Sequence, residues 1–146
     1  MSNSPNVTRT GHCLCGNVRY SVLGDPIIVA HCHCDDCQRL TGAGHSTGAM
    51  YSESQLALEG RTSEFKLTSE AGNEVTRVFC PLCGSPILGK NTGMGGFVTI
   101  SLGTMDDSNG LEPGVVVFSR NRKSWDVMDD AVASFDGQPE WSPDDA

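Results

Sequence analysis

One turn of the chain reads Cys80-Pro81-Leu82-Cys83-Gly84, with two thiols at its tip and a glycine at its end. This spacing is typical of a zinc knuckle, because the glycine lets backbone amides approach and hydrogen-bond the metal-bound sulfurs. A second pair, in Cys13-Leu14-Cys15-Gly16, has the same ending and precedes a strand-like run. Four thiolates complete a tetrahedron around zinc. We therefore predict a closed structural zinc site made of Cys13, Cys15, Cys80 and Cys83.

Such a site would fasten the start of the domain to its middle. Joining residues 15 and 80 through a metal closes a long loop, and this removes chain entropy from the unfolded state. The alternative interpretation is that these four cysteines are reduced, buried and free of metal.

The other three cysteines lie together in His31-Cys32-His33-Cys34-Asp35-Asp36-Cys37. Three thiolates leave one coordination position on zinc for water or substrate, as in catalytic zinc sites. This centre suits a soft fourth ligand, particularly a thiol that stays nucleophilic once bound. We predict an open, catalytic zinc site at Cys32, Cys34 and Cys37, and thus two Zn²⁺ per chain. Two alternatives stay open: His33 or His45 closes the tetrahedron, or the triplet is partly free of metal.

The composition indicates one domain in a reducing compartment. A chain of 146 residues has the length of a single domain, which metal ions would help to stabilise. The seven cysteines are an odd number, and residues 1–9 lack the charged start and apolar run of a secretory signal. We therefore expect a cytoplasmic location without a disulfide framework. No apolar stretch of the sequence approaches the roughly 20 residues of a membrane-spanning helix, so we expect no membrane partner.

The net charge of −8 comes mainly from the end of the chain. Seven of the 18 acidic residues lie from Asp126 onward, where there is no lysine or arginine. The rest of the chain has 11 acidic and ten basic residues and is therefore close to neutral. A nucleic-acid-binding domain would carry a basic stripe, and we therefore expect no nucleic-acid partner.

Short apolar runs separated by glycine and other turn residues predict a mainly β fold. We expect strands at 17–23, 27–30, 64–68, 74–79, 97–102 and 115–119. A helical turn is expected after Cys37, with its end near Gly42. Both ends of the chain are polar and rich in turn formers. We therefore expect a flexible start at 1–10, one domain at 11–137 and an acidic flexible tail at 138–146.

Three segments carry the cysteines in a specific order and spacing: 11–18, 31–42 and 79–84. In these segments the chain resembles the family of glutathione-dependent formaldehyde-activating enzymes. These are S-(hydroxymethyl)glutathione synthase-like proteins with the GFA domain that is also named for centromere protein V. The likeness runs over nearly the whole chain and continues in 115–119, in Trp125 and in Phe135-Asp136-Gly137.

The resemblance implies a β-tent, or Mss4-like, fold, in which small coiled antiparallel sheets are held by a structural zinc. It implies that Cys13, Cys15, Cys80 and Cys83 are the structural ligands and that Cys32, Cys34 and Cys37 hold the catalytic zinc. It also implies a carbon–sulfur lyase that forms S-(hydroxymethyl)glutathione from formaldehyde and glutathione. The partners would be a small-molecule thiol and an aldehyde, with glutathione as the candidate thiol, although fold alone does not fix the substrate.

Histidines near the second cluster are candidate proton donors, because histidine titrates near neutral pH. They are His31, His33 and His45, of which we count His33 among the catalytic candidates. Arg39 follows the cluster and is a candidate for a bidentate contact with a substrate carboxylate. The alternative function is a zinc-stabilised β-tent binding module without catalytic activity. Exposed strand edges in so small a domain also favour a homodimer.

Overall fold

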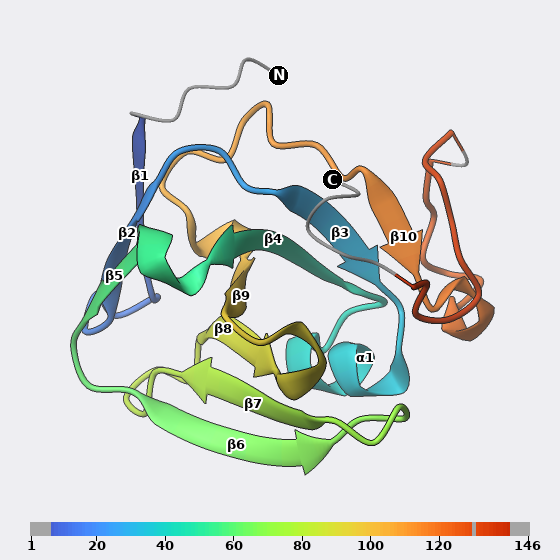
Figure 1. Ribbon diagram of the computed structural model, residues 1–146, viewed down its shortest axis with the longest axis horizontal. Coiled ribbons are helices and arrows are strands. Elements are labelled where there is room, and N and C mark those ends of the chain that lie inside the picture. Colours follow the sequence, from blue (N-terminus) through green and yellow to red (C-terminus); the bar gives the residue numbers. More distant parts are fainter. Residues whose placement is uncertain (1–6, 130, 141–146) are drawn as a thin grey trace.

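The computed structural model describes residues 7–129 and 131–140 (Figure 1). In this part of the chain it contains ten strands, one α-helix and four short 3₁₀ turns. The strands are β1 (Thr8–His12), β2 (Arg19–Leu23), β3 (Ile28–Cys32), β4 (Ser46–Ser52), β5 (Leu56–Glu59), β6 (Ser63–Thr68), β7 (Glu74–Phe79), β8 (Pro86–Asn91), β9 (Phe97–Ser101) and β10 (Val115–Val117). The helix is α1 (Asp35–Thr41), and the 3₁₀ turns are η1 (Glu53–Gln55), η2 (Thr92–Met94), η3 (Leu102–Thr104) and η4 (Ser119–Asn121).

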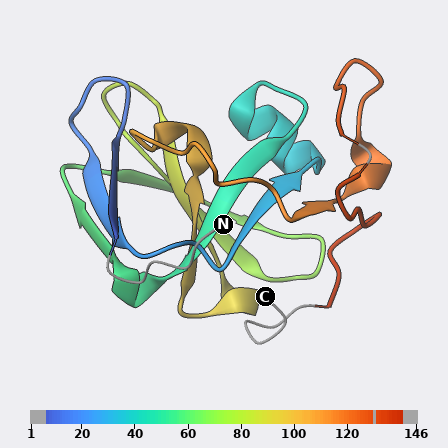
Figure 2. The same ribbon diagram turned by 90° about the horizontal axis from the view of Figure 1, so that it is seen from above.

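The strands form two sheets, and the prediction of a mainly β fold is confirmed. The smaller sheet has the order β1-β2-β5 and is antiparallel. The larger sheet has the order β10-β3-β4-β9-β8-β7-β6 and is antiparallel except for the β10–β3 pair. It turns strongly between β4 and β6, and α1 lies on its inner side (Figure 1), while the smaller sheet stands at one flank (Figure 2).

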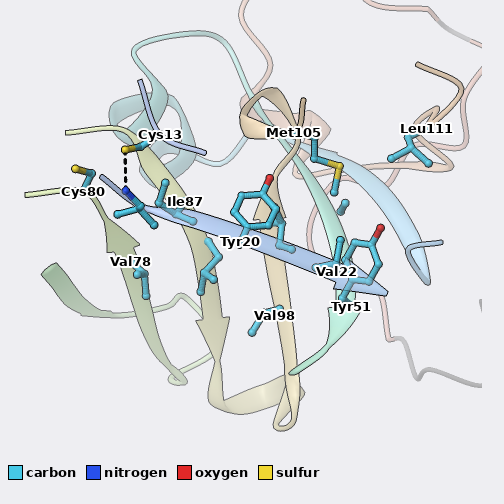
Figure 3. Packing of buried hydrophobic residues seen from close by; sticks show 14 of the residues in the cluster. Cys13, Tyr20, Val22, Tyr51, Val78, Cys80, Ile87, Val98, Met105 and Leu111 are labelled. Atoms are coloured by element: carbon cyan, nitrogen blue, oxygen red, sulfur yellow. Dashed lines mark hydrogen bonds between the residues drawn. The ribbon is translucent and has the colours of Figure 1, made fainter. Parts of the chain in front are cut away.

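The core lies between the two sheets. Buried and less buried residues alternate along β2, so that Tyr20 and Val22 enter the core between exposed or half-buried neighbours. Both side chains face the larger sheet, where Tyr51 and Val98 lie (Figure 3). Full burial of such an apolar side chain stabilises the fold by about 1.5–3 kcal/mol. The core therefore holds the smaller sheet on the larger one.

A single glycine lets β1 approach this core closely. A Cβ atom on Gly11 would collide with the ring of Tyr20 and with the backbone carbonyl of Thr104. The Tyr20 hydroxyl lies 2.7 Å from Thr104 Oγ1, so the ring is also held from its far end. The contact fixes the position of the chain just before the first cysteine pair.

All six expected strands are present, with ends that differ by at most two residues. The predicted helical turn is α1, and it ends in a left-handed Gly42 with φ of 70°. Four strands, β1, β4, β5 and β8, were not expected. β1 begins at Thr8, inside the stretch 1–10 for which a flexible start was predicted. Of the predicted tail 138–146, residues 141–146 lie outside the described part of the chain.

No helix in the described ranges is long and apolar enough to cross a membrane. The longest helical element there is α1, with seven residues.

Candidate metal centres

Four cysteine sulfurs converge where the β1–β2 turn meets the β7–β8 turn. The Sγ atoms of Cys13, Cys15, Cys80 and Cys83 all lie within 4.8 Å of one another. The Sγ of Cys15 lies 3.6 Å from that of Cys13 and 3.7 Å from that of Cys80. Zinc–sulfur bonds of about 2.3 Å in a tetrahedron place the sulfurs about 3.8 Å apart. This donor set therefore fits a zinc ion with little rearrangement.

Hydrogen-bond donors contact two of these sulfurs, those of Cys13 and Cys80. The Val18 backbone N–H donates to Cys13 Sγ at 3.2 Å. A dashed line at Cys13 marks this hydrogen bond in Figure 3. Cys80 Sγ accepts from the Leu82 backbone N–H and from the Asn17 side-chain amide, both at 3.4 Å. Such contacts orient metal ligands and stabilise thiolates. The four-sulfur group is thus surrounded as a structural metal site would be.

Ser85 connects the two turns of the four-sulfur group. Its hydroxyl accepts from the Leu14 backbone N–H at 3.0 Å and lies 3.2 Å from Cys83 Sγ. The hydrogen bond from the Ser85 side chain is the largest of the contacts that lower the pKa of the Cys83 thiol to about 5. The Ser85 hydroxyl therefore favours the thiolate form of Cys83.

The second sulfur group is built by the end of β3 and the start of α1. Cys32 closes the strand, and Cys34 caps the helix by accepting from the Cys37 backbone N–H at 3.2 Å. Asp35 and Asp36 in the first turn interact favourably with the helix dipole, which supports so short a helix at this place. The three Sγ atoms lie within 4.8 Å of one another.

No fourth protein ligand joins this group in residues 7–129 and 131–140. His33 lies between Cys32 and Cys34 in sequence, yet its Nδ1 faces the Gly44 carbonyl oxygen at 3.0 Å. Its ring belongs to a separate cluster with His45 and Asp126. Three soft donors without a fourth suit zinc with one position open to an outside ligand.

Hydrogen bonds and one nearby positive charge favour the thiolate form of Cys37. Hydrogen bonds from Cys32 and then from Cys34 lower the pKa of the Cys37 thiol, and Ser46 and the positive charge of Arg77 add to this effect. Arg77 Nη2 lies 3.7 Å from Cys37 Sγ. Hydrogen bonds with Cys34 and then with Cys37 raise the pKa of Cys32. A metal ion must therefore displace protons from this group, and its affinity rises with pH.

A cavity of about 270 Å³ opens beside Cys37. Its walls come from α1, β4, β7, β8, β9 and η3. Ser46 and Arg77 line the cavity and also contact Cys37, so the cavity and the three-sulfur group share one border. Arg39, the arginine expected to meet a substrate, is exposed and does not line the cavity.

The histidines form a network next to the three-sulfur group. Asp126 Oδ2 lies 2.7 Å from His45 Nδ1 and 3.2 Å from the Nδ1 of the fully buried His33. His31 Nδ1 contacts the Thr47 hydroxyl at 2.8 Å, and burial, followed by the nearby His45, lowers the pKa of His31. Asp126 reaches the network from the segment after β10, which lies alongside α1 (Figures 1 and 2).

Sequence reasoning grouped the seven cysteines as the structure does, but it missed Arg77 and Asp126. Arg77 is a single charge in a predicted strand, and Asp126 is the first of a run of acids. Neither residue has a local motif. The pattern along 74–79 gave no signal for Arg77 either, because the buried Val75 and Val78 are three positions apart and lie on opposite faces of the strand.

The fold and the two sulfur groups define a mainly β protein with donor sets suited to metal ions. Residues 8–121 match the family described as "Glutathione-dependent formaldehyde-activating enzyme", and this range contains all seven cysteines and Arg77. The chain belongs to this family. Members of the family are enzymes of formaldehyde and glutathione adduct chemistry. Asp126 lies beyond the matched range.

Among solved structures, a Rhodobacter sphaeroides protein is similar to this chain with a TM-score of 0.53 and 15% sequence identity. The match covers 69% of this chain and 91% of the other. At this identity the likeness shows a shared fold alone. No curated protein matches the chain.

Proposed function

We propose that this protein is a zinc-dependent carbon–sulfur lyase of the S-(hydroxymethyl)glutathione synthase type. It would handle the adduct of a thiol, such as glutathione, with a small aldehyde in the cytoplasm. The observation that carries the proposal is the three-sulfur group of Cys32, Cys34 and Cys37, which borders a cavity and has no fourth ligand among the residues that the structure describes.

The proposal includes the architecture around the site. Residues 11–137 would form one β-tent domain, in which a structural zinc on Cys13, Cys15, Cys80 and Cys83 holds the sheets together. The sulfur spacing near 3.7 Å supports this assignment. Two zinc ions per chain would follow.

Cys32, Cys34 and Cys37 would hold the catalytic zinc. Zinc in such a site lowers the pKa of a thiol that ligates it. The protein itself would bind the thiol in the cavity, keep bulk water away with apolar walls, and favour negative charge on sulfur through Arg77 and Ser46. Orientation of two reactants in this way is a large part of enzymatic rate enhancement.

Addition of the thiol to formaldehyde forms one carbon–sulfur bond and moves the carbonyl electron pair onto oxygen. The proton that the thiol loses is matched by the proton that this oxygen gains. His33 is the proposed proton donor, and His45 would connect it to solvent, because His33 is fully buried while the His45 side chain is 24% exposed. Asp126 would hold both rings by accepting from their Nδ1 atoms.

The experiment is exchange NMR on formaldehyde and glutathione with catalytic amounts of the zinc-loaded protein. We expect the protein to accelerate exchange between free formaldehyde and the adduct, and we expect Cys37→Ser to remove the acceleration. If the zinc-loaded protein leaves the spontaneous rate unchanged, this substrate pair is wrong. The zinc-stabilised binding module would then be favoured.

A further inference from the structure

Arg77 lies in a row of residues that crosses the inner face of the larger sheet. In the strand register Arg77 of β7 is opposite Gly89 of β8, and Gly89 is opposite Thr99 of β9. All three residues line the cavity. Their neighbours Val78 and Leu88 belong to the buried core and also line the cavity. The row therefore presents one guanidinium and one hydroxyl to whatever occupies the cavity.

Gly89 makes room for this guanidinium. A Cβ atom at position 89 would lie only 2.7 Å from Arg77 Nη1, so the guanidinium occupies the space that any larger side chain would need. The backbone at Gly89 does not require glycine for a positive φ. The glycine serves the position of Arg77 rather than a turn.

The guanidinium keeps donors for a ligand. A guanidinium has five N–H donors, and Arg77 has one hydrogen bond within the described residues, from Nη2 to Cys37 Sγ. No carboxylate pairs with it there, and no aspartate or glutamate lines the cavity. An arginine in a cavity without an internal counter-charge is suited to a carboxylate from outside.

We propose that Arg77 is the specificity-determining residue of the site and binds a carboxylate of the thiol substrate, so that the cavity selects thiols that carry a carboxylate. This inference rests on the proposed function, because it names the substrate class of the same site. The cavity of about 270 Å³ is slightly smaller than typical pockets for drug-sized ligands, so it fits a small thiol acid or the carboxylate end of a larger one. The walls of the cavity offer no carboxylate to pair with an ammonium group of the substrate, so such a group would lie outside the cavity.

The test compares 3-mercaptopropionate with its uncharged amide, 3-mercaptopropionamide, as ligands of the zinc-loaded protein. Binding is followed by NMR shifts of the Gly89 and Thr99 amides. We expect the acid to bind about tenfold more tightly or better, since a hydrogen bond between two charged groups is stronger than one to a neutral amide. Arg77→Gln should remove this preference, while Lys90→Gln should keep it. Lys90 follows Gly89 in β8 but does not line the cavity, so it controls for the change in net charge.

A second variant covers the case in which Arg77→Gln loses zinc because the contact to Cys37 is gone. Gly89→Ala keeps the charge and displaces the guanidinium, whose end is flexible, so it should retain both zinc ions and still reduce the preference. Propionate and propionamide, which have no thiol, serve as probes that do not depend on the metal. Equal binding of acid and amide to the native protein, or a preference that survives in both variants, would overturn the inference.

The same ligands separate this inference from the proposed function. If the protein prefers the acids but does not accelerate aldehyde exchange, the lyase activity is contradicted and the binding of a carboxylate by Arg77 is still supported. If exchange is accelerated equally with 3-mercaptopropionate and with its amide, the binding of a carboxylate by Arg77 is contradicted and the lyase activity is still supported.

Discussion

At the scale of single residues, the two sulfur groups differ in how their thiolates are stabilised. The four-sulfur group relies on neutral donors, among them the Ser85 hydroxyl and backbone N–H groups. The three-sulfur group borders a charged side chain, Arg77, and an open cavity. Neutral donors suit a structural metal ion, whereas the positive charge of Arg77 can also bind a negatively charged substrate group.

Ser85→Ala tests the stabilisation of Cys83. The pKa of Cys83 is lowered to about 5, chiefly by Ser85, so the thiolate forms above that pH. Without the hydroxyl the pKa rises towards its ordinary value, and deprotonation requires a higher pH. We expect the variant to lose the structural zinc to a competing chelator at pH 6 and to retain it more nearly like the native protein at pH 9. Zinc retention is measured against pH.

The control for this experiment is Ser124→Ala, which changes an exposed serine outside the site. A retention profile that is the same for Ser85→Ala and for the native protein would show that Ser85 does not control Cys83.

At the same scale, the sequence predicted the two groups of cysteines but not the residues around them. Cysteines reveal their role through spacing, because ligands one to three residues apart can surround one ion. Arg77 contacts a cysteine 40 positions earlier, and Asp126 contacts a histidine 81 positions earlier. Such contacts depend on strand order and on the path of the last segment, which no local pattern encodes.

At the scale of elements, the periodic strands could be predicted and the non-periodic ones could not. β2 has one buried face, so its buried residues alternate with less buried ones, and β7 is rich in valine, threonine and phenylalanine, which favour strands. β4 is buried over Gly48–Tyr51 and contains small residues instead of an alternating pattern. β8 starts at Pro86 and includes Gly89, both of which normally indicate turns. Both strands pair with a neighbour on each side, β4 with β3 and β9 and β8 with β9 and β7. In β8, Gly89 leaves room for the side chain of Arg77.

Gly11→Ala tests the packing of β1. The new methyl group would collide with the Tyr20 ring and with a backbone carbonyl of η3, so one of the elements must move. Overpacking of this kind typically costs about 1–3 kcal/mol. We expect a loss of that size in the free energy of unfolding, measured with urea in the presence of zinc. Gly103→Ala is the matched control, because a Cβ atom there meets nothing within 4 Å, and a loss as large in this control would refute the explanation.

At the scale of the whole molecule, each sulfur group has a different part in the fold. The four-sulfur group joins turns that are 65 positions apart, from Cys15 to Cys80, and thereby ties the smaller sheet to the larger one. The three-sulfur group lies within six residues, at the junction of β3 and α1. Loss of a long-range link should affect the entire fold, whereas loss of a local one should affect the site.

Matched cysteine variants test this difference. Cys83→Ser should strongly lower the stability, because it opens the long-range link. Cys37→Ser should leave a folded protein with about one zinc and no exchange activity, because the other ion holds the fold. Circular dichroism and metal analysis are the measurements. Equal unfolding in both variants would mean that the second group is structural as well.

The central claim is that one sulfur group is complete and the other accepts an outside thiol. Zinc X-ray absorption measures the average number of sulfur ligands per zinc in the fully loaded protein. We predict about 3.5 sulfurs per zinc without substrate, because seven cysteine sulfurs are shared by two zinc ions. With saturating glutathione we predict about 4, because the substrate thiol adds an eighth sulfur. A sulfur number that does not rise when the thiol is added, in protein that holds two zinc ions, would contradict the claim.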